Sequence, residues 1–231
     1  EDFSKLCNYI YPRLRRKENP FDYENLVSYL KVIFPNEQIE NEVRITQIGG
    51  MSNKNFKVVK GSSEYVLRVP GNGSEGMVVR SNEEQNSMQA CKMGINPPVR
   101  YFNAKNGIKL ADYVRNAETL NGATIQRTSN MDKIVKIFQT LHHSHVRFGN
   151  EFNVFNEILN YEHLLEKANG RMYEGYEPIR EKVFQLEEYL NSLGVSVKPC
   201  HNDLVAENFL KAEDGTIYLI DWEYSGMNDP M

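Results

Sequence analysis

Three polar side chains near the end of the sequence have the types and the spacing that phosphoryl transfer requires. Asp203 follows His201 by two positions, Asn208 comes after four further residues, and Asp221 lies thirteen residues beyond Asn208. An Asp and an Asn that a hairpin brings together can hold Mg²⁺, which neutralises phosphate oxygens. A second Asp, free of the metal, can accept the proton of an attacking hydroxyl. Asn208 and Asp221 therefore fit the metal-binding role, and Asp203 fits the role of catalytic base.

The order His-x-Asp, four residues and then Asn is also the spacing of a kinase catalytic loop. Asp214-Gly215 favours a tight turn downstream, which would fold two short strands together and bring Asn208 and Asp221 to one site. The alternative is that this polar set only caps a turn. The complete set, with its hairpin, favours the catalytic interpretation.

A glycine-containing segment between the first two expected strands could approach a phosphate. Small residues in Ile48–Asn53 would let backbone N–H groups contact phosphate oxygens. A Gly-Gly pair between strands is also an ordinary turn, and the segment is not the G-x-G-x-x-G pattern of protein kinases. Its place in the first hairpin favours nucleotide binding, which we assign to Gly50, Met51, Ser52 and Asn53.

Arg68 stands on the third expected strand, and Glu83 lies early in the helix that follows. A kinase-like lobe needs a cation on this strand to hold the α- and β-phosphates, and a helix carboxylate to orient that cation. Arginine suits the task because its planar fork binds phosphate through two hydrogen bonds. The alternative is a strand surface charge and a solvated helix carboxylate, and the adjacent Glu84 competes with Glu83 for the role.

Acidic and aromatic residues are interleaved after Asp221, in Trp222, Glu223 and Tyr224. Carboxylates beside aromatic rings suit a cationic acceptor, through charge and cation–π attraction. The alternative is that the rings are core packing, which is as good an explanation for Trp222 as substrate contact.

The elements that must position these side chains divide the chain into a short extension and two lobes. Apolar spacing predicts a helical extension over residues 1–42, in which Pro35-Asn36 stops the helical run, and a β-rich lobe over residues 43–115. Within this lobe we expect a helix and five strands, which are Asn82–Met93 for the helix and Val43–Gly49, Asn55–Lys60, Glu64–Val69, Val99–Phe102 and Gly107–Val114 for the strands.

Residues 116–231 are predicted to form a mainly helical lobe after a hinge at 113–117. Three helix faces are expected, with Met131, Ile134, Val135, Phe138 and Leu141 on the first, Val154, Phe155, Ile158, Leu159, Leu164 and Leu165 on the second, and Ile179, Val183, Phe184, Leu186 and Leu190 on the third. Ser129 and Asp132 resemble a capping box before the first face. Extended segments are expected at Val195–Pro199, Phe209–Lys211 and Ile217–Trp222. The predicted fold class is α+β, with an antiparallel N-terminal lobe.

Composition excludes several other classes of protein. The 231 residues carry a formal net charge of −4, without the basic excess of a nucleic-acid binder. No apolar run approaches the roughly 20 residues of a membrane-spanning helix, so we expect no membrane insertion. Three scattered cysteines argue against a disulfide framework and favour a reducing compartment, the cytoplasm. Because the sequence begins with Glu, we expect a fragment. The oligomeric state is left open.

The motifs together resemble the choline/ethanolamine kinase family, within the wider group of aminoglycoside-phosphotransferase-like kinases. The resemblance is closest to bacterial choline kinases and covers about residues 40–231. It rests on these segments: Cys200–Asn208, Ile220–Pro230, Ile48–Phe56, Tyr65–Gly71, Arg80–Asn86 and Phe148–Glu162.

This resemblance implies a bilobal protein-kinase-like fold and Mg²⁺-dependent transfer of a phosphoryl group from ATP to a small cationic alcohol. By position, it makes Asp203 the base, Asn208 and Asp221 the metal ligands, and Arg68 with Glu83 the phosphate-holding pair. It places the adenine-contacting hinge near Asp112 and Tyr113. The acceptor would lie by Asp203, Trp222, Glu223 and Tyr224. The family continues past the Asn-Asp-Pro segment into further helices, which this sequence lacks.

Two alternatives to a choline kinase stay open. A related kinase acting on ethanolamine, thiamine or an aminoglycoside would share the same catalytic skeleton. A nucleotide-binding pseudokinase module would keep the fold without the reaction. Trp222-Glu223-Tyr224 favours choline or ethanolamine, and every catalytic position is chemically competent.

Overall fold

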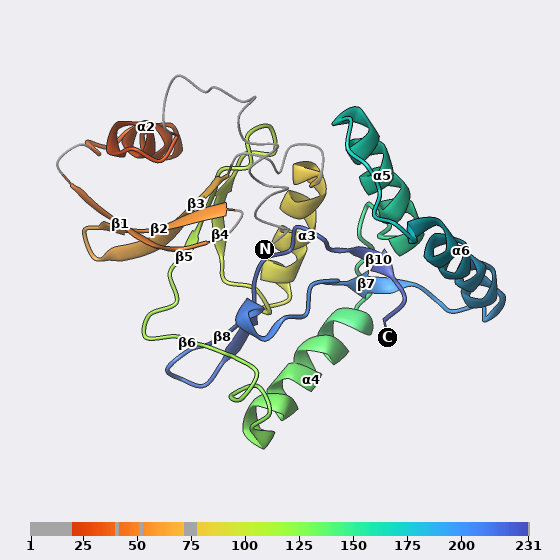
Figure 1. Cartoon of the computed structure of the whole chain (residues 1–231). Helices are drawn as coiled ribbons and strands as arrows, with labels where there is room; N and C mark the ends of the chain where they lie inside the picture. The colour runs from red at the N-terminus through yellow and green to blue at the C-terminus, as the bar shows by residue number, and fades with distance from the viewer. Residues whose placement is uncertain (1–19, 40–41, 51–52, 72–77, 231) are drawn as a thin grey trace.

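The first lobe is built on one antiparallel sheet, which carries the residues expected to bind a nucleotide. A computed structural model describes residues 20–39, 42–50, 53–71 and 78–230. The sheet consists of β1 (Val43–Gly49), β2 (Asn53–Lys60), β3 (Ser63–Pro70), β4 (Val99–Phe102) and β5 (Lys109–Asp112). These strands lie in the order β1-β2-β3-β5-β4, and all neighbours are antiparallel (Figure 1). The expected strand over 107–114 is therefore shorter at both ends.

Helix α2 (Tyr23–Ile33) packs on this sheet. Asp22 caps its first turn by accepting the backbone N–H of Asn25. The buried residues of α2 meet alternate residues of β2 and β3, in a core of Leu26, Val27, Leu30, Phe56, Val58, Leu67 and Val69. The helix ends two residues before Pro35, because proline lacks the N–H that a continuing helix needs. The predicted stop at Pro35-Asn36 is confirmed, and the described residues after Phe34, up to Ile39, are not helical. The part of the expected extension over residues 1–19 lies outside the described residues.

Helix α3 (Arg80–Lys92) lies between the sheet and the second lobe (Figure 1). It begins two residues before the expected start, and Gly94, at a φ of +73°, follows its end. Its buried side chains are mostly polar: Glu83, Asn86, Ser87 and Ala90. Buried polar groups require hydrogen-bond partners, so this helix must be held by specific contacts rather than by an apolar stripe alone.

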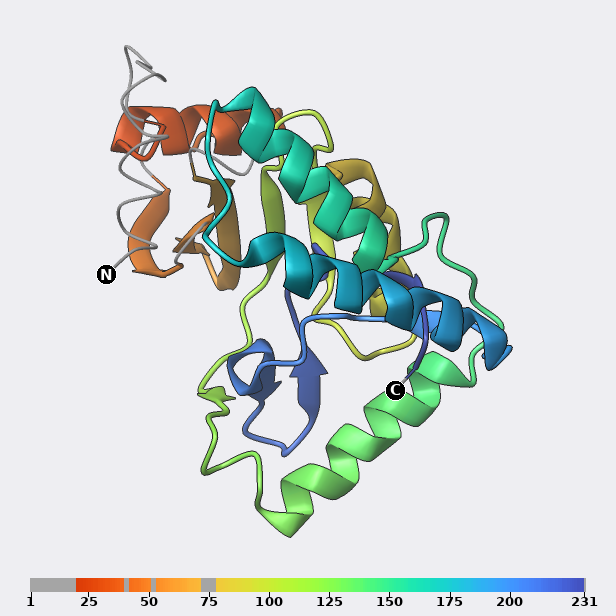
Figure 2. The same ribbon diagram turned by 45° about the vertical axis from the view of Figure 1, so that its right-hand side comes forward.

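The second lobe contains three α-helices, α4 (Thr128–His142), α5 (Val154–Lys167) and α6 (Tyr176–Ser192), and one short 3-10 helix, η2 (Ala206–Asn208). Figure 2 shows α5 and α6 side by side and α4 apart from them. Two small antiparallel sheets complete the lobe, one of β6 (Glu118–Thr119), β8 (Phe209–Lys211) and β9 (Ile217–Leu219), the other of β7 (Lys198–Cys200) and β10 (Gly226–Asn228). The α+β class with an antiparallel first lobe and a mainly helical second lobe is confirmed.

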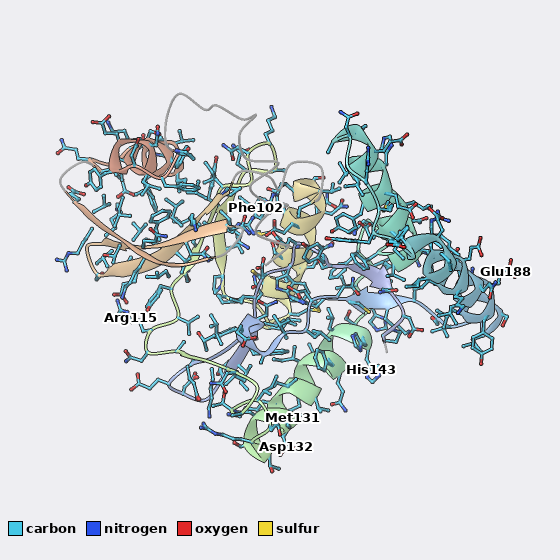
Figure 3. The ribbon with its side chains drawn as sticks, in the orientation of Figure 1. Phe102, Arg115, Met131, Asp132, His143 and Glu188 are labelled. Atoms are coloured by element: carbon cyan, nitrogen blue, oxygen red, sulfur yellow. The ribbon has the colours of Figure 1, made fainter. Side chains whose placement is uncertain are left out.

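The predicted capping box and part of the predicted face of α4 are wrong. The helix begins at Thr128, its N-cap residue is Arg127, and no side chain caps it, so Ser129 lies inside the first turn. Met131 and Val135 are 44% and 46% exposed, and Figure 3 shows Met131 and Asp132 at the outer end of α4. The buried stripe is instead Asn130, Ile134, Ile137 and Leu141. Met131 and Val135 each follow a residue of this stripe by one position, which turns their side chains about 100° away from the core.

Helix α6 does not bury the apolar face predicted for it. No residue of α6, which the structure describes throughout, is fully buried, and Ile179, Leu186 and Leu190 are exposed. One contact with α5 pairs the rings of Phe155 and Phe184, whose centroids lie 5.8 Å apart. The apolar periodicity predicted the helix correctly, but no element among the described residues covers the apolar face of α6.

The C-terminal extended segments differ from their predicted lengths. β7 covers Lys198–Cys200 rather than residues 195–199, and β9 ends at Leu219 rather than Trp222. The chain leaves β9 because Asp221 adopts a φ of +69°, which breaks the ladder. The tight turn at Asp214-Gly215 is formed, and β8 pairs with β9 through Phe209 opposite Leu219.

Among the described residues, the structure holds no helix of the length and apolar character needed to cross a membrane.

The core beneath the catalytic segment can be tested at Leu219, which is completely buried among residues of α4, β8 and the end of α3. Leu219→Ala is expected to lower the free energy of unfolding by about 2–5 kcal/mol, because it removes buried methyl groups and leaves a cavity. Leu193→Ala is the matched control, since Leu193 is exposed, and should change that energy by less than about 0.5 kcal/mol. Urea titration of both variants measures the difference, and equal effects would contradict the described core.

Candidate active site

The segment Cys200–Asn208, for which the sequence predicts a catalytic role, is organised around His201, which is buried. Burial lowers the pKa of His201, so the ring is neutral at pH 7. Its Nε2 lies 2.9 Å from the carbonyl oxygen of Ile220, and its Nδ1 accepts the backbone N–H of Asp203 at 3.3 Å. These partners assign the proton to Nε2, which donates to the carbonyl. One neutral ring thereby holds both Asp203 and the residue before Asp221.

Asn208 connects the proposed base to the hairpin. Its Nδ2 donates to the backbone oxygen of Asp203 at 2.9 Å and to Oδ2 of the same residue at 3.0 Å. The N–H of Ile220 donates to the carbonyl of Asn208 at 2.9 Å, which continues the β8–β9 pairing. Asp203, Asn208 and Asp221 are therefore brought together, and the Asn208 Oδ1 is left to accept or to ligate.

Asp221 lies at the junction of the two lobes. Its side chain is 38% exposed, and its Oδ1 lies 3.9 Å from Nη1 of Arg68 on β3. Asn202, at a φ of +65°, bends the opposite segment and donates to the carbonyl of Tyr224 at 2.9 Å. Both bends place short polar side chains in the left-handed region, which Asn and Asp tolerate better than other non-glycine residues.

Arg68 and Glu83 form a buried ion pair, as their positions suggested. The Arg68 guanidinium donates to both carboxylate oxygens, with Nη2 at 2.8 Å from Oε2. Lys109 and Arg80 also contact this carboxylate, at 3.1 and 3.0 Å. Burial alone would raise the pKa of Glu83, but Lys109, Arg68 and Arg80 together hold it well below its usual range. Glu83, rather than Glu84, is thus the partner of Arg68.

Glu223 joins the nucleotide segment to α3. Its Oε2 accepts hydrogen bonds from Nδ2 of Asn53 at 3.2 Å and from Nη1 of Arg80 at 3.1 Å. Burial and the nearby Asp221 carboxylate raise the pKa of Glu223. The Oδ1 of Asn53 is buried and has no partner among the described residues. Glu223 therefore faces the lobe junction, which places a carboxylate between the start of β2 and the start of α3.

A second polar contact between the lobes was missed by the sequence analysis. Nδ2 of the buried Asn86 lies 2.9 Å from Oδ1 of Asn150, 3.0 Å from Oγ of Ser225 and 3.1 Å from its carbonyl oxygen. The contact fixes α3 to the segment that carries Asp221. The sequence could have indicated this contact, because Asn86 lies three residues after Glu83 and therefore near it on the helix surface.

The aromatic residues near the site have two different environments. Trp222 is completely buried, packs edge-on against His201 at 4.8 Å between ring centroids, and donates its Nε1–H to Leu219. A side chain without accessible surface offers no contact to a ligand, so the expected place of Trp222 at the acceptor pocket is corrected to the core. Tyr224 is half-buried beside Phe152, and burial together with Glu223 raises its pKa to about 12.

The residues expected at the adenine hinge have partners of their own. Asp112 accepts two hydrogen bonds from Arg100, at 2.7 and 2.6 Å, and the ring of Tyr113 lies 4.1 Å beneath Nζ of Lys57.

Of the remaining residues expected to bind the nucleotide, Gly50 follows β1 at a φ of +108°, where an added Cβ would collide with the carbonyl of Asn53. Met51 and Ser52 lie outside the described residues.

The donor set fits a hard divalent cation. Asp221 offers a carboxylate that is 38% exposed, and Asn208 offers an amide oxygen to which no described residue donates; these are ligand types that Mg²⁺ prefers. Within the described ranges, no group of three or more His, Cys, Asp or Glu side chains could hold a metal ion by itself. Such an arrangement suits Mg²⁺ shared with substrate phosphates, since this ion is commonly bound by one or two protein groups plus phosphate oxygens.

The sequence profile described as choline/ethanolamine kinase matches residues 45–230. The chain belongs to the choline/ethanolamine kinase family. It is 33% identical over 217 residues to a protein LicA of Haemophilus influenzae, covering 89% of this chain and 62% of that protein. It therefore spans less than two thirds of this relative's length.

Solved structures of this kinase family have the same fold. The choline kinase LicA from Streptococcus pneumoniae superposes with a TM-score of 0.75 at 37% identity, over 88% of this chain and 71% of that one. A LicA structure in complex with AMP gives a TM-score of 0.77 at 37% identity, over 90% and 71%. An aminoglycoside phosphotransferase, APH(2")-IIa, shares the fold at 17% identity with a TM-score of 0.60. The protein-kinase-like fold expected from the motifs is thereby confirmed.

Glu83→Gln is expected to lower the free energy of unfolding at pH 7 by about 3 kcal/mol, because buried cations lose their shared carboxylate. The folded-state pKa of Glu83 lies far below its ordinary value of 4.5, so its contribution is complete above about pH 4.5. That contribution is lost as the pH falls further. Urea denaturation from pH 7 to pH 3.5 should show the gap between wild type and variant narrowing below pH 4.5.

Glu84→Gln provides the matched control, since it makes the same change one residue away from the ion pair. It should change the free energy of unfolding by less than about 0.5 kcal/mol at any pH in this range. If Glu83→Gln lowers the free energy of unfolding by as little as Glu84→Gln does, the described charge cluster is contradicted.

Proposed function

We propose that this chain is the nucleotide-binding and catalytic part of a choline kinase, which transfers the γ-phosphoryl group of ATP to the choline hydroxyl. The observation that carries the proposal is the junction of Asp203, Asn208 and Asp221 with the buried pair Arg68–Glu83. This set combines a base, metal ligands and a phosphate-holding cation in one place. The similarity to a choline kinase and to a LicA structure containing AMP supports both substrates.

In the proposed reaction, Asp203 accepts the proton of the choline hydroxyl as its oxygen attacks the γ-phosphorus. The new bond joins that oxygen to phosphorus, the bond to the β-phosphate oxygen breaks, and ADP leaves. The Asn208 amide donates to the Asp203 carboxylate and so fixes its orientation. The products are phosphocholine and ADP.

Phosphate binding is assigned to Arg68, whose direction is set by Glu83. Asn208 and Asp221 would hold Mg²⁺, which supplies charge neutralisation of the phosphate oxygens when bound. The remaining nucleotide contacts are proposed for the segment 50–53 and for the strand end at Asp112 and Tyr113.

We assign the cationic headgroup of choline to the surroundings of Tyr224. The Tyr224 ring has Phe152 at 6.4 Å between centroids, and the Asp203 and Glu223 carboxylates act on its pKa, so aromatic and acidic groups gather there. A quaternary ammonium ion is attracted to the faces of aromatic rings and to nearby carboxylates. The proposed cell compartment is the cytoplasm, where ATP is available.

The proposal is tested by ADP release from the full-length protein with ATP and Mg²⁺, in parallel with choline, ethanolamine, thiamine and an aminoglycoside. Choline is expected to stimulate ADP release most. Its quaternary ammonium group carries a permanent charge and no N–H donors, so it suits an aromatic site. If another acceptor stimulates ADP release more strongly, that acceptor and not choline is the substrate, and the choline assignment is contradicted. ATP binding without stimulation by any acceptor would favour a nucleotide-binding module and contradict the proposal.

Asp203→Asn is expected to reduce choline-dependent ADP release at least about 100-fold, the usual contribution of a general base, while ATP affinity stays within about twofold. The matched control is Asp214→Asn in the β8–β9 turn, where an Asn oxygen can still accept the N–H of Thr216. This control should keep full activity. Equal loss of ATP binding and of activity in Asp203→Asn would show that Asp203 is structural.

A further inference from the structure

Lys109 is a largely buried cation, 14% exposed, that the proposed reaction does not use. It opens β5 and lies directly opposite Arg68 in the β3–β5 pairing, so both side chains project from the same face of the sheet. Its Nζ lies 3.1 Å from Oε1 of Glu83, the same oxygen that accepts from Nη1 of Arg68. Two cations on neighbouring strands therefore share one carboxylate oxygen.

The two cations also share an aromatic neighbour. The Arg68 guanidinium carbon lies 5.5 Å from the ring centroid of Phe102, and the Lys109 ammonium lies 5.8 Å from it. Phe102 ends β4, and Figure 3 shows it between the sheet and α3. Cation–π attraction and the carboxylate together hold Lys109 beside Arg68 rather than in solvent.

Three cations and three carboxylates meet on this side of the lobe junction among the described residues. Arg68, Arg80 and Lys109 all contact Glu83, while Glu223 lies 3.1 Å from Arg80 and Asp221 lies 3.9 Å from Arg68. Burial and the charge of Arg68 lower the pKa of Lys109, whereas Glu83 and Asp221 act to raise it. Glu83, the carboxylate in contact with Lys109, is also the one that directs Arg68.

Arg68 has a limited number of donors to give to a phosphate. Its Nη1 and Nη2 both contact Glu83, Nη2 also lies 3.2 Å from the carbonyl of Gly107, and its Nε has no partner among the described residues. Nη1 is the group nearest Asp221, at 3.9 Å, and thus nearest the expected phosphates. A second cation at Oε1 of Glu83 weakens the electrostatic attraction between this carboxylate and Nη1 of Arg68.

We propose that Lys109 is a positioning residue for ATP: by sharing Oε1 of Glu83, it leaves the Nη1 side of Arg68 available to the nucleotide phosphates. The inference rests on ATP being the bound nucleotide in the proposed function. Lys109 acts through Glu83 and touches no reacting atom. Loss of its charge increases the hold of Glu83 on Arg68 and weakens ATP binding, with little effect on the chemical step.

The test measures ATP affinity of the full-length protein by calorimetry, without any acceptor, for wild type and for Lys109→Met. Removal of one charge at this distance is expected to weaken ATP about tenfold. Lys109→Arg keeps the charge and should bind ATP within about threefold of wild type. Lys105→Met, in the exposed turn before β5, is the matched control and should bind as wild type does. Unchanged ATP affinity in Lys109→Met would overturn the inference.

A double-mutant cycle separates action through Glu83 from direct contact with phosphate. In a Glu83→Gln background, Lys109→Met should weaken ATP less than about twofold, because the shared carboxylate is already gone. An equal tenfold loss in both backgrounds would overturn the positioning role. Thermal melting shows whether each variant is folded; if Lys109→Met is not, Lys109→Gln takes its place in the same cycle.

The kinetic split gives a further check with choline as acceptor. Lys109→Met should raise the KM for ATP about tenfold and leave kcat within about twofold. A fall in kcat with an unchanged KM would overturn the inference. If wild type binds ATP but releases no ADP with any acceptor, the proposed reaction fails, while the affinity comparison still decides the role of Lys109.

Discussion

The site depends on one buried carboxylate. Glu83 is almost completely inaccessible to water, and three cations from three elements converge on it: Arg68 from β3, Arg80 from the start of α3 and Lys109 from β5. A carboxylate in this position is tolerated only because its charge is paired. The same requirement fixes the distance between α3 and the sheet. The Arg68 guanidinium, which we propose holds the nucleotide phosphates, therefore has a defined direction before any ligand arrives.

Helix α3 serves both lobes, and this explains its unusual buried face. Glu83 faces the sheet, Asn86 is bonded to Ser225 and Asn150, and Ala90 belongs to the core of the second lobe. A purely apolar face would bury as much surface, but it would fix the two lobes less specifically. Hydrogen bonds have strict geometry, so they relate Arg68 to Asp221 across the junction with little freedom. The Arg80–Glu223 contact adds a second connection of this kind.

The segment Cys200–Asn208 carries polar side chains and packs on a buried apolar core. Trp222 and Leu219 are completely buried beneath it, and His201 packs against the Trp222 ring. The neutral His201 then joins the two segments that carry Asp203 and Asp221. Because its pKa is lowered by burial, this link does not depend on protonation near pH 7. As a result, the side chain of Asp221 is partly exposed while its backbone is held by buried groups.

The sequence by itself determined the catalytic spacing, the five strands of the first lobe and the α+β class, because these follow from local residue patterns. It also singled out Arg68 and Glu83, although it left Glu84 as a competitor. It did not indicate the short strands β6 and β10 of the second lobe. Only the tertiary structure decided that Glu83 is the partner and that Trp222 is core. It also brought Lys109 to the same carboxylate. These outcomes depend on which side chains from distant segments meet and lose water, and periodicity along one segment carries no information about that. The faces predicted for α4 and α6 show the same limit, since a pattern indicates an apolar side but not the neighbour that covers it.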